Sequence, residues 1–251
     1  MNDSALSDLL DATVDAVRAA LDGIDDWGPA GTRPGQYRSD LVADAAAIDR
    51  LTSAGMGVFS EESGRHHPER RITVVVDPLD GSTNASRGLS WWACSLCALD
   101  EQGPLTAVVA DLVHGTRYTA QRGAGAWVDG EPLAASGCTR MDKALVGVNG
   151  LPDRHLGWAQ FRALGSAALD LCAVAAGSMD AYVDLTDSGL APWDYMGALL
   201  ICRQAGAVVE EVRDRELVVI EDGQRRSPCA AATPDLLQAL RAALDGEVDQ
   251  R

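Results

Sequence analysis

No stretch of this sequence approaches the roughly 20 apolar residues that a membrane-spanning helix needs. The longest apolar run, from Trp91 to Leu99, is interrupted by cysteine and serine. The first twelve residues, MNDSALSDLLDA, are acidic and contain neither the basic nor the apolar segment of a secretory leader. We therefore expect a cytoplasmic protein without a membrane segment.

Basic residues are few beside acidic ones, because 21 Lys and Arg stand against 37 Asp and Glu, for a formal net charge of -16. Nucleic acid and anionic membranes require a basic surface, so we expect neither as a partner. A phosphorylated substrate is compatible with this charge, since carboxylates loaded with divalent cations attract phosphate.

Several reactive motifs are also missing. Cys94 and Cys97 form a C-x-x-C without the second pair that a zinc site needs, and the six cysteines lie mostly in apolar runs, so reduced, buried thiols are expected. The sequence has no G-x-S-x-G elbow, no Walker A motif and no G-x-G-x-x-G after a strand. These absences disfavour covalent serine hydrolysis and nucleotide- or dinucleotide-dependent enzymes.

The first half of the chain reads as helices packed against a sheet. Apolar residues at helical spacing predict helices over 6–21 and 40–53, and two apolar runs, GVFS and ITVVV, predict buried strands. From Trp91 to Val128, successive strand patterns separated by turn signals predict an antiparallel meander.

After about Thr139 predicted strands and helices alternate, and Thr233, Pro234 and Gly246 mark a final helix by its cap, first residue and end. We expect an N-terminal α+β subdomain over 1–138 and a C-terminal α/β subdomain over 139–251. A shared interface between such units is a favoured place for an active site.

The most informative stretch is D-P-L-D-G-S-T-N, residues 77–84, which directly follows the strand ITVVV. Carboxylates fixed on a tight turn suit Mg²⁺, a hard cation that prefers oxygen ligands. Gly81, Ser82 and Thr83 offer backbone N–H groups where a helix could begin, and such a terminus binds phosphate. The alternative is an ordinary turn whose hydroxyls cap a helix.

Two further acidic features stand at the ends of predicted elements. Glu61 and Glu62 follow the strand GVFS, although such a pair is often a solvated turn. Asp194 follows Pro192-Trp193 and opens an apolar helix, where its carboxylate either caps the helix or binds a metal.

The order of E-E-S-G, D-P-L-D-G-S-T-N, G-S-A-A-L-D-L-C and a distal W-D, between about Asp40 and Val209, resembles the inositol monophosphatase family. These are Mg²⁺-dependent, lithium-sensitive phosphatases of small molecules. The resemblance implies an α+β fold, a layered α-β-α-β-α sandwich of the sugar-phosphatase type. The subdomain 1–138 would carry most metal ligands, and 139–251 would complete the metal and substrate site.

The resemblance also implies the metal ligands. Glu61, Asp77 and the Leu79 carbonyl would bind one Mg²⁺, and Asp77, Asp80 and Asp194 would bind a second. A third ion would be held weakly by Glu61 and water, and Mn²⁺ could replace Mg²⁺. Metal-activated water would then hydrolyse the phosphate ester, since two cations stabilise the attacking and leaving oxygens.

Ser82 stands where the family has a hydroxyl that helps to deprotonate this water, paired with an acid on the preceding helix. We choose Asp44 for that partner, alongside Glu61 and Ser82 as catalytic residues, and keep Asp40 as the alternative because the local sequence departs from the family spacing. The backbone around Gly81, Ser82 and Thr83 would hold the phosphate.

For the alcohol half of the substrate, the resemblance implies Gly165, Ser166, Ala167 and Asp184. A carboxylate that accepts hydrogen bonds from paired hydroxyls would select a polyol. The family commonly has Glu at the position of Asp184, and the stretch 185–192 is longer than expected. Both departures concern substrate choice.

We therefore expect a metal-dependent phosphoric monoester hydrolase acting on a small phosphorylated metabolite, with inositol monophosphate as the first candidate. Histidinol phosphate, fructose 1,6-bisphosphate and 3′-phosphoadenosine 5′-phosphate are alternative substrates. A non-catalytic metal- or phosphate-binding regulatory protein is the alternative from another class. The resemblance also implies lithium inhibition and a homodimer.

Overall fold

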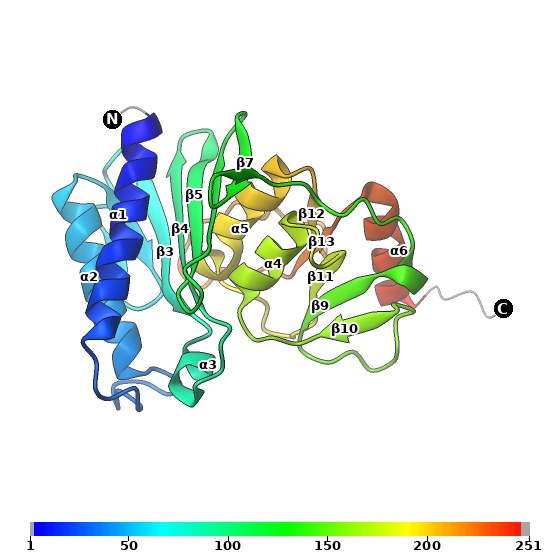
Figure 1. Ribbon diagram of the computed structural model, residues 1–251, viewed down its shortest axis with the longest axis horizontal. Helices are drawn as coiled ribbons and strands as arrows, with labels where there is room; N and C mark the ends of the chain where they lie inside the picture. The colour runs from blue at the N-terminus through cyan, green and yellow to red at the C-terminus, as the bar shows by residue number, and fades with distance from the viewer. Residues whose placement is uncertain (1–2, 247–251) are drawn as a thin grey trace.

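The computed structural model describes residues 3–246 and has five layers, helices alternating with two sheets (Figure 1). Three clusters of buried apolar side chains lie between successive layers. The predicted α+β sandwich is confirmed. No helix in residues 3–246 is long and apolar enough to cross a membrane.

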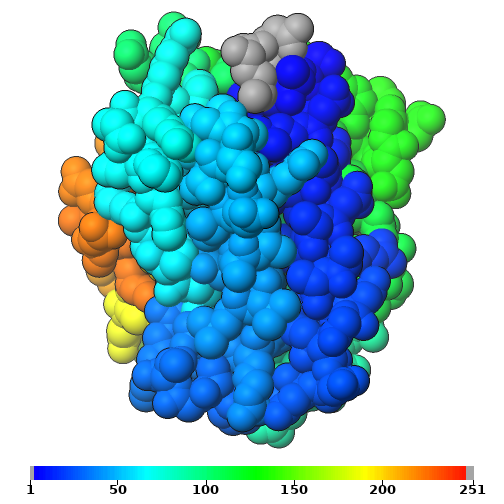
Figure 2. Space-filling view, turned by 90° about the vertical axis from the view of Figure 1, so that its left-hand side faces the viewer, coloured from blue at the N-terminus to red at the C-terminus, as the bar shows by residue number. Residues whose placement is uncertain are grey.

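The outer helical layer consists of α1 (Asp3–Asp22) and α2 (Arg38–Ser53), which lie side by side (Figure 2). Leu10, Val14 and Val17 recur at helical spacing in α1 and are buried against the sheet. The inner face of α2 is different, because it buries Asp40 and Asp44 together with alanines. The face of α2 that packs on the first sheet is therefore partly polar.

The first sheet has the strand order β2-β1-β3-β4-β5-β6-β7-β8. Strand β1 runs parallel to β3, and β3 to β8 pair antiparallel in succession. The meander that the turn signals predicted from Trp91 to Val128 corresponds to β4 to β7. The strands are β1 (Gly57–Ser60), β2 (Gly64–His66), β3 (Thr73–Asp80), β4 (Ala93–Asp100), β5 (Gly103–Asp111), β6 (Arg117–Gln121), β7 (Gly125–Val128) and β8 (Glu131–Pro132). The short helix α3 (Ser82–Arg87) follows β3 after a single residue.

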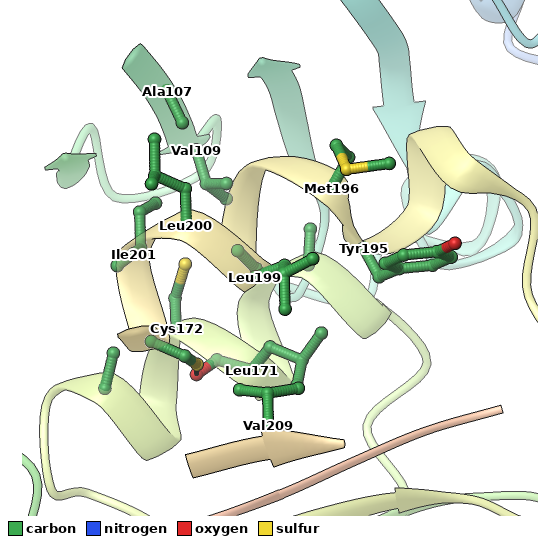
Figure 3. Packing of buried hydrophobic residues seen from close by; sticks show 14 of the residues in the cluster. Ala107, Val109, Leu171, Cys172, Tyr195, Met196, Leu199, Leu200, Ile201 and Val209 are labelled. Carbon is green, nitrogen blue, oxygen red and sulfur yellow. Dashed lines mark hydrogen bonds between the residues drawn. The ribbon is translucent and has the colours of Figure 1, made fainter. Parts of the chain in front are cut away.

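The central layer consists of α4 (Ala167–Ala175) and α5 (Pro192–Gln204), and both helices are buried on nearly all sides. Figure 3 shows their apolar side chains between Val109 of the first sheet and Val209 of the second. Although α5 comes late in the chain, it packs on strands β3 to β7. The two halves of the chain therefore share one core.

The second sheet, β10-β9-β11-β13-β12, is mixed: β9 runs parallel to β10 and β11, whereas β13 is antiparallel to both β11 and β12. Its strands are β9 (Leu145–Asn149), β10 (Gln160–Arg162), β11 (Ala181–Asp184), β12 (Val208–Glu211) and β13 (Pro228–Ala231). Helix α6 (Pro234–Asp245) covers its outer face, with Thr233 as N-cap, as predicted. The sequence patterns missed β2, β8, β10 and β13, whose two to four residues are too few to show a period.

Candidate active site

The site begins where the parallel pairing of β1 with β3 ends. Ser60 lies opposite Val76 in the register, so Glu61 and Asp77 follow at the same level, and the Glu61 amide donates to the Val76 carbonyl at 3.1 Å. Because parallel strands present their carboxyl ends at one edge, two carboxylates far apart in sequence become neighbours.

An irregular turn near the end of β3, at Pro78 and Leu79, fixes the carboxylates of Asp77 and Asp80. The pairing of β3 with β4 shifts between Asp77 and Asp80, so Pro78 and Leu79 form an irregularity in the strand. The Leu79 amide donates to Asp77 Oδ1 at 3.0 Å, and Asp80 Oδ2 accepts from Ser166 Oγ at 2.6 Å. The same oxygen of Asp80 accepts from the Ala168 amide at 2.7 Å, which ties this turn to the start of α4.

Asp194 enters from the central layer, in the first turn of α5. Its Oδ2 accepts from the Ala191 amide at 2.7 Å, so this side chain caps the helix as one interpretation of the sequence proposed. It also lies in the cluster, because ligand oxygens of Glu61, Asp77 and Asp194 are all within 4.8 Å of one another. The two roles that the sequence left as alternatives are therefore compatible.

Burial and mutual repulsion make these carboxyls hard to ionise together. Loss of solvation, reinforced by Asp194, raises the pKa of Glu61 to about 8. Loss of solvation and the charge of Asp80 raise the pKa of Asp194 to about 7, and loss of solvation raises that of Asp80 to about 6. Burial and the charge of Glu61 raise the pKa of Asp77 well above its ordinary range.

These properties fit a divalent cation. Oxygen ligands from three separate elements converge, and backbone amides hold Asp77 and Asp194 in place. A group of carboxylates whose ionised forms repel one another is stabilised by a cation at its centre. Asp80 lies beside this group as an electrostatic neighbour of Glu61, Asp77 and Asp194 and is held by α4.

The structure separates the two acids of α2. Asp44 Oδ1 accepts from Ser60 Oγ at 2.5 Å, and Ser60 in turn accepts from the Glu62 amide, so Asp44 supports the turn that carries Glu61. Burial raises the pKa of Asp40 to about 6. Asp40 lies near Ser82, whose hydroxyl partly opposes this increase. Of the two acids, Asp40, one helical turn before Asp44, is therefore the one that lies beside Ser82.

The segment predicted to hold phosphate wraps tightly against the second half of the chain. Gly81 has a φ of 88°, and a Cβ there would lie 3.0 Å from the Trp91 carbonyl and 3.1 Å from that of Gly165. Ser82 and Thr83 form the first turn of α3, where amides have no acceptor within the helix. Asn84 Nδ2 donates to the carbonyls of Trp91 and Leu164, which holds this turn in place.

A cavity of about 210 Å³ opens beside the carboxylates. Gly165, Ser166 and Ala167 line it, although the Ser166 hydroxyl is buried and donates to Asp80. Asp184 is only 2% exposed and is not among the described residues that line the cavity. The residues that line it are Asp80, Val148, Asn149, Gly165, Ser166, Ala167, Asp170, Tyr182, Leu190 and Asp194.

Sequence reasoning missed two polar residues of this cavity. Asn149 ends β9, and a polar residue at the carboxyl end of a predicted strand was the available signal. Asp170 is an acid within the apolar helix α4, and burial raises its pKa to about 8 although Trp91 Nε1 donates to it at 2.9 Å. An isolated acid in an apolar helix was the signal there.

Carboxylates arranged for divalent cations, a helix start and a polar cavity, set in a five-layer sandwich, are the features of a metal-dependent phosphatase. The family model described as "Inositol monophosphatase family" matches residues 39–247, and the chain belongs to this family. Members of the family act on inositol or sugar phosphates with divalent metal ions, so the chain is a metal-dependent phosphatase.

Two curated relatives illustrate the range of names in the family. The chain is 32% identical over 217 residues to the Nus factor SuhB of Salmonella typhimurium, and the aligned region covers 79% of this chain and 77% of the relative. It is also 32% identical over 217 residues to the fructose-1,6-bisphosphatase/inositol-1-monophosphatase of Thermococcus kodakarensis, covering 83% and 82%. The solved inositol monophosphatase of Anabaena shares the fold, with a TM-score of 0.82 at 22% identity over 98% of this chain and 97% of that chain.

Proposed function

We propose that this protein hydrolyses inositol monophosphate or a closely related polyol phosphate. The convergence of Glu61, Asp77 and Asp194 within 4.8 Å beside a polar cavity supports this proposal most directly. Asp80 and the Leu79 carbonyl would complete the set that holds two Mg²⁺, with a third ion or Mn²⁺ as variations. Divalent cations there would supply charge for the phosphate and a lowered pKa for a water molecule.

The protein's own groups have distinct tasks in this proposal. The amides around Gly81, Ser82 and Thr83 bind phosphate oxygens at the start of α3. Ser82 Oγ orients the attacking water, and Asp40, ionised above its pKa of about 6, receives the proton through that hydroxyl. Trp193 packs edge to face on Phe59 at 5.1 Å between ring centroids, which steadies the first turn of α5 and so Asp194.

A panel of phosphate monoesters with Mg²⁺ tests the substrate. We expect the largest kcat/KM for inositol 1-phosphate among inositol 1-phosphate, histidinol phosphate, fructose 1,6-bisphosphate and 3′-phosphoadenosine 5′-phosphate. Fructose 1,6-bisphosphate is the second candidate, because the Thermococcus kodakarensis relative carries both activities in its name. Binding of Mg²⁺ without hydrolysis of any ester, including an aryl phosphate, would instead favour a regulatory protein.

Asp40→Asn and Asp44→Asn separate the two acids of α2. We expect Asp40→Asn to lower kcat by roughly 10²-fold with little change in KM, since it removes a proton acceptor and keeps the shape. Asp44→Asn should instead lower stability by about 1–3 kcal/mol, because Ser60 is buried and donates to this carboxylate. Steady-state kinetics and thermal melting distinguish the two, and a larger kcat loss in Asp44→Asn would return the role to Asp44.

Three further properties are proposed on the family resemblance: lithium inhibition, a homodimer and a cytoplasmic location. All six cysteines are free thiols, and five of them are buried, which supports a reducing compartment. An activity titration with LiCl and light scattering test the first two.

A further inference from the structure

Asn149 lines the cavity where the acidic side chain of Asp184 was expected. It ends β9 next to Asp184 of β11 in the register, and its Nδ2 donates to Asp184 Oδ1 at 3.0 Å. The same Asp184 oxygen accepts from the Thr186 hydroxyl at 2.8 Å and from the Thr186 amide at 3.3 Å. Asn149 therefore lines the cavity, whereas Asp184 is 2% exposed, does not line it, and has no partner for its Oδ2 among the described residues.

This arrangement fixes which way the Asn149 amide points. One N–H is held by Asp184, so the second N–H and the Oδ1 carbonyl, a donor and an acceptor pair, are left for a ligand. A hydroxyl group both donates and accepts one hydrogen bond or more, and it matches this pair. An aryl ring does not.

Tyr182 gives a second, independent indication of a polar ligand. Its side chain lines the same cavity and is fully buried, yet its hydroxyl has no hydrogen-bond partner among residues 3–246. A buried hydroxyl without a partner costs free energy unless a ligand or water satisfies it. Val148 and Leu190 supply apolar wall around these polar groups.

We propose, resting on the proposed function, that Asn149 and Tyr182 recognise hydroxyl groups on the alcohol half of the substrate, and that Asp184 acts through Asn149 as a positioning residue. The substrate class is a phosphate monoester of a compact polyol whose hydroxyls reach the cavity wall while the phosphate lies at the carboxylates. This changes the role of Asp184 from a direct ligand of hydroxyls to a support.

The test compares kcat/KM for inositol 1-phosphate with kcat/KM for p-nitrophenyl phosphate, which has no hydroxyl groups on its ring. Asn149→Leu keeps the side-chain size and removes its hydrogen bonds. We expect the inositol-to-aryl ratio to fall at least about tenfold, mostly through KM, because a site built to bond hydroxyls discriminates by those bonds. Asp187→Asn, an exposed change on the neighbouring loop, is the matched control and should leave the ratio unaltered.

Two further variants test the remaining groups. Tyr182→Phe removes only the unpartnered hydroxyl, so the ratio should fall severalfold while the melting temperature holds or rises. Asp184→Asn keeps an acceptor for Asn149 and should retain most of the ratio, whereas Asp184→Leu should lower it as Asn149→Leu does. If Asp184→Asn retains the ratio and Asp184→Leu loses it, Asp184 acts by positioning Asn149 through a hydrogen bond. If both variants lose the ratio, the negative charge of Asp184 is required.

The outcomes distinguish this inference from the proposed function. An equal loss on both esters in Asn149→Leu, or an unchanged ratio in a folded variant, would overturn the recognition role while leaving polyol phosphate hydrolysis standing. If the unaltered enzyme hydrolysed p-nitrophenyl phosphate with Mg²⁺ and no polyol phosphate, the proposed substrate itself would be wrong.

Discussion

Asp77→Asn is expected to lower kcat/KM by roughly 10³-fold or more while the fold is retained. Asparagine has the same shape, and its carbonyl oxygen can still accept from the Leu79 amide, so the irregular turn near the end of β3 keeps its hydrogen bond. It lacks the charge that a divalent cation requires, and Asp77 lies deepest among the three clustered carboxylates. Steady-state kinetics with saturating Mg²⁺ measures the effect.

The same change should stabilise the metal-free protein. Burial and the neighbouring Glu61 raise the pKa of Asp77, which means that its ionised form costs stability in the folded state. Removing the charge should therefore raise the melting temperature in EDTA. Asp49→Asn, at an exposed position of α2, makes the same change in charge and controls for it. Near-normal turnover in Asp77→Asn would exclude Asp77 as a metal ligand.

The metal-free protein is expected to lose stability as the pH rises from about 5 to 8. Glu61, Asp194 and Asp80 have folded-state pKa values of about 8, 7 and 6, above the ordinary values of 4.5, 3.8 and 3.8. Between the ordinary and the raised values the folded state binds more protons than the unfolded state. The stability present at low pH is therefore lost as these groups ionise in the folded protein.

Mg²⁺ should reverse this trend. At pH 5 protons compete for the same carboxylates, whereas near pH 8 this competition is much weaker and the ion binds more strongly, so the increase in melting temperature caused by Mg²⁺ should grow with pH. Melting curves in EDTA and in Mg²⁺ across this range measure it. Asp194→Asn should flatten the EDTA curve. A melting temperature in EDTA that increases steadily from pH 5 to 8 would contradict the repulsion described for the cluster.

Asp77 and Asp80 could be predicted from sequence because their geometry is local: both belong to D-P-L-D-G, directly after the apolar run ITVVV. Glu61 by its local sequence could equally stand in a solvated turn, and it is the parallel pairing of β1 with β3 that brings it beside Asp77. Asp194 depends on a contact that no local pattern contains, since α5 packs on β3 although it comes more than a hundred residues later than that strand. Only the resemblance to a family supplied that contact in advance.

The choice between Asp40 and Asp44 could not be made from spacing. The two residues lie one turn apart on the same buried face of α2, so helical periodicity treats them alike. The position of α2 on the first sheet separates them, because it places Asp44 against Ser60 and Asp40 near Ser82. Packing between the layers sets this position.

Asp184 shows a similar limit. Alternation along β11 puts Tyr182 and Asp184 on one face of the sheet, as the pattern indicates. Whether the carboxylate reaches a ligand depends on side-chain length and on the neighbours, and here Asn149 and Thr186 occupy its Oδ1. Asn149, on the adjacent strand β9, therefore lines the cavity, and Asp184 does not.

The position of Asp194 on α5 has a mechanical consequence. A divalent ion, if held by both Asp77 and Asp194 as proposed, would be a reversible cross-link between the first sheet and the central helices. Such a link closes a long loop of chain, which lowers the conformational entropy of the unfolded protein if the ion remains bound and favours the assembled layers in the folded one. Removing the ion would therefore loosen the junction between the two halves, and hydrogen exchange of the α5 amides would report it.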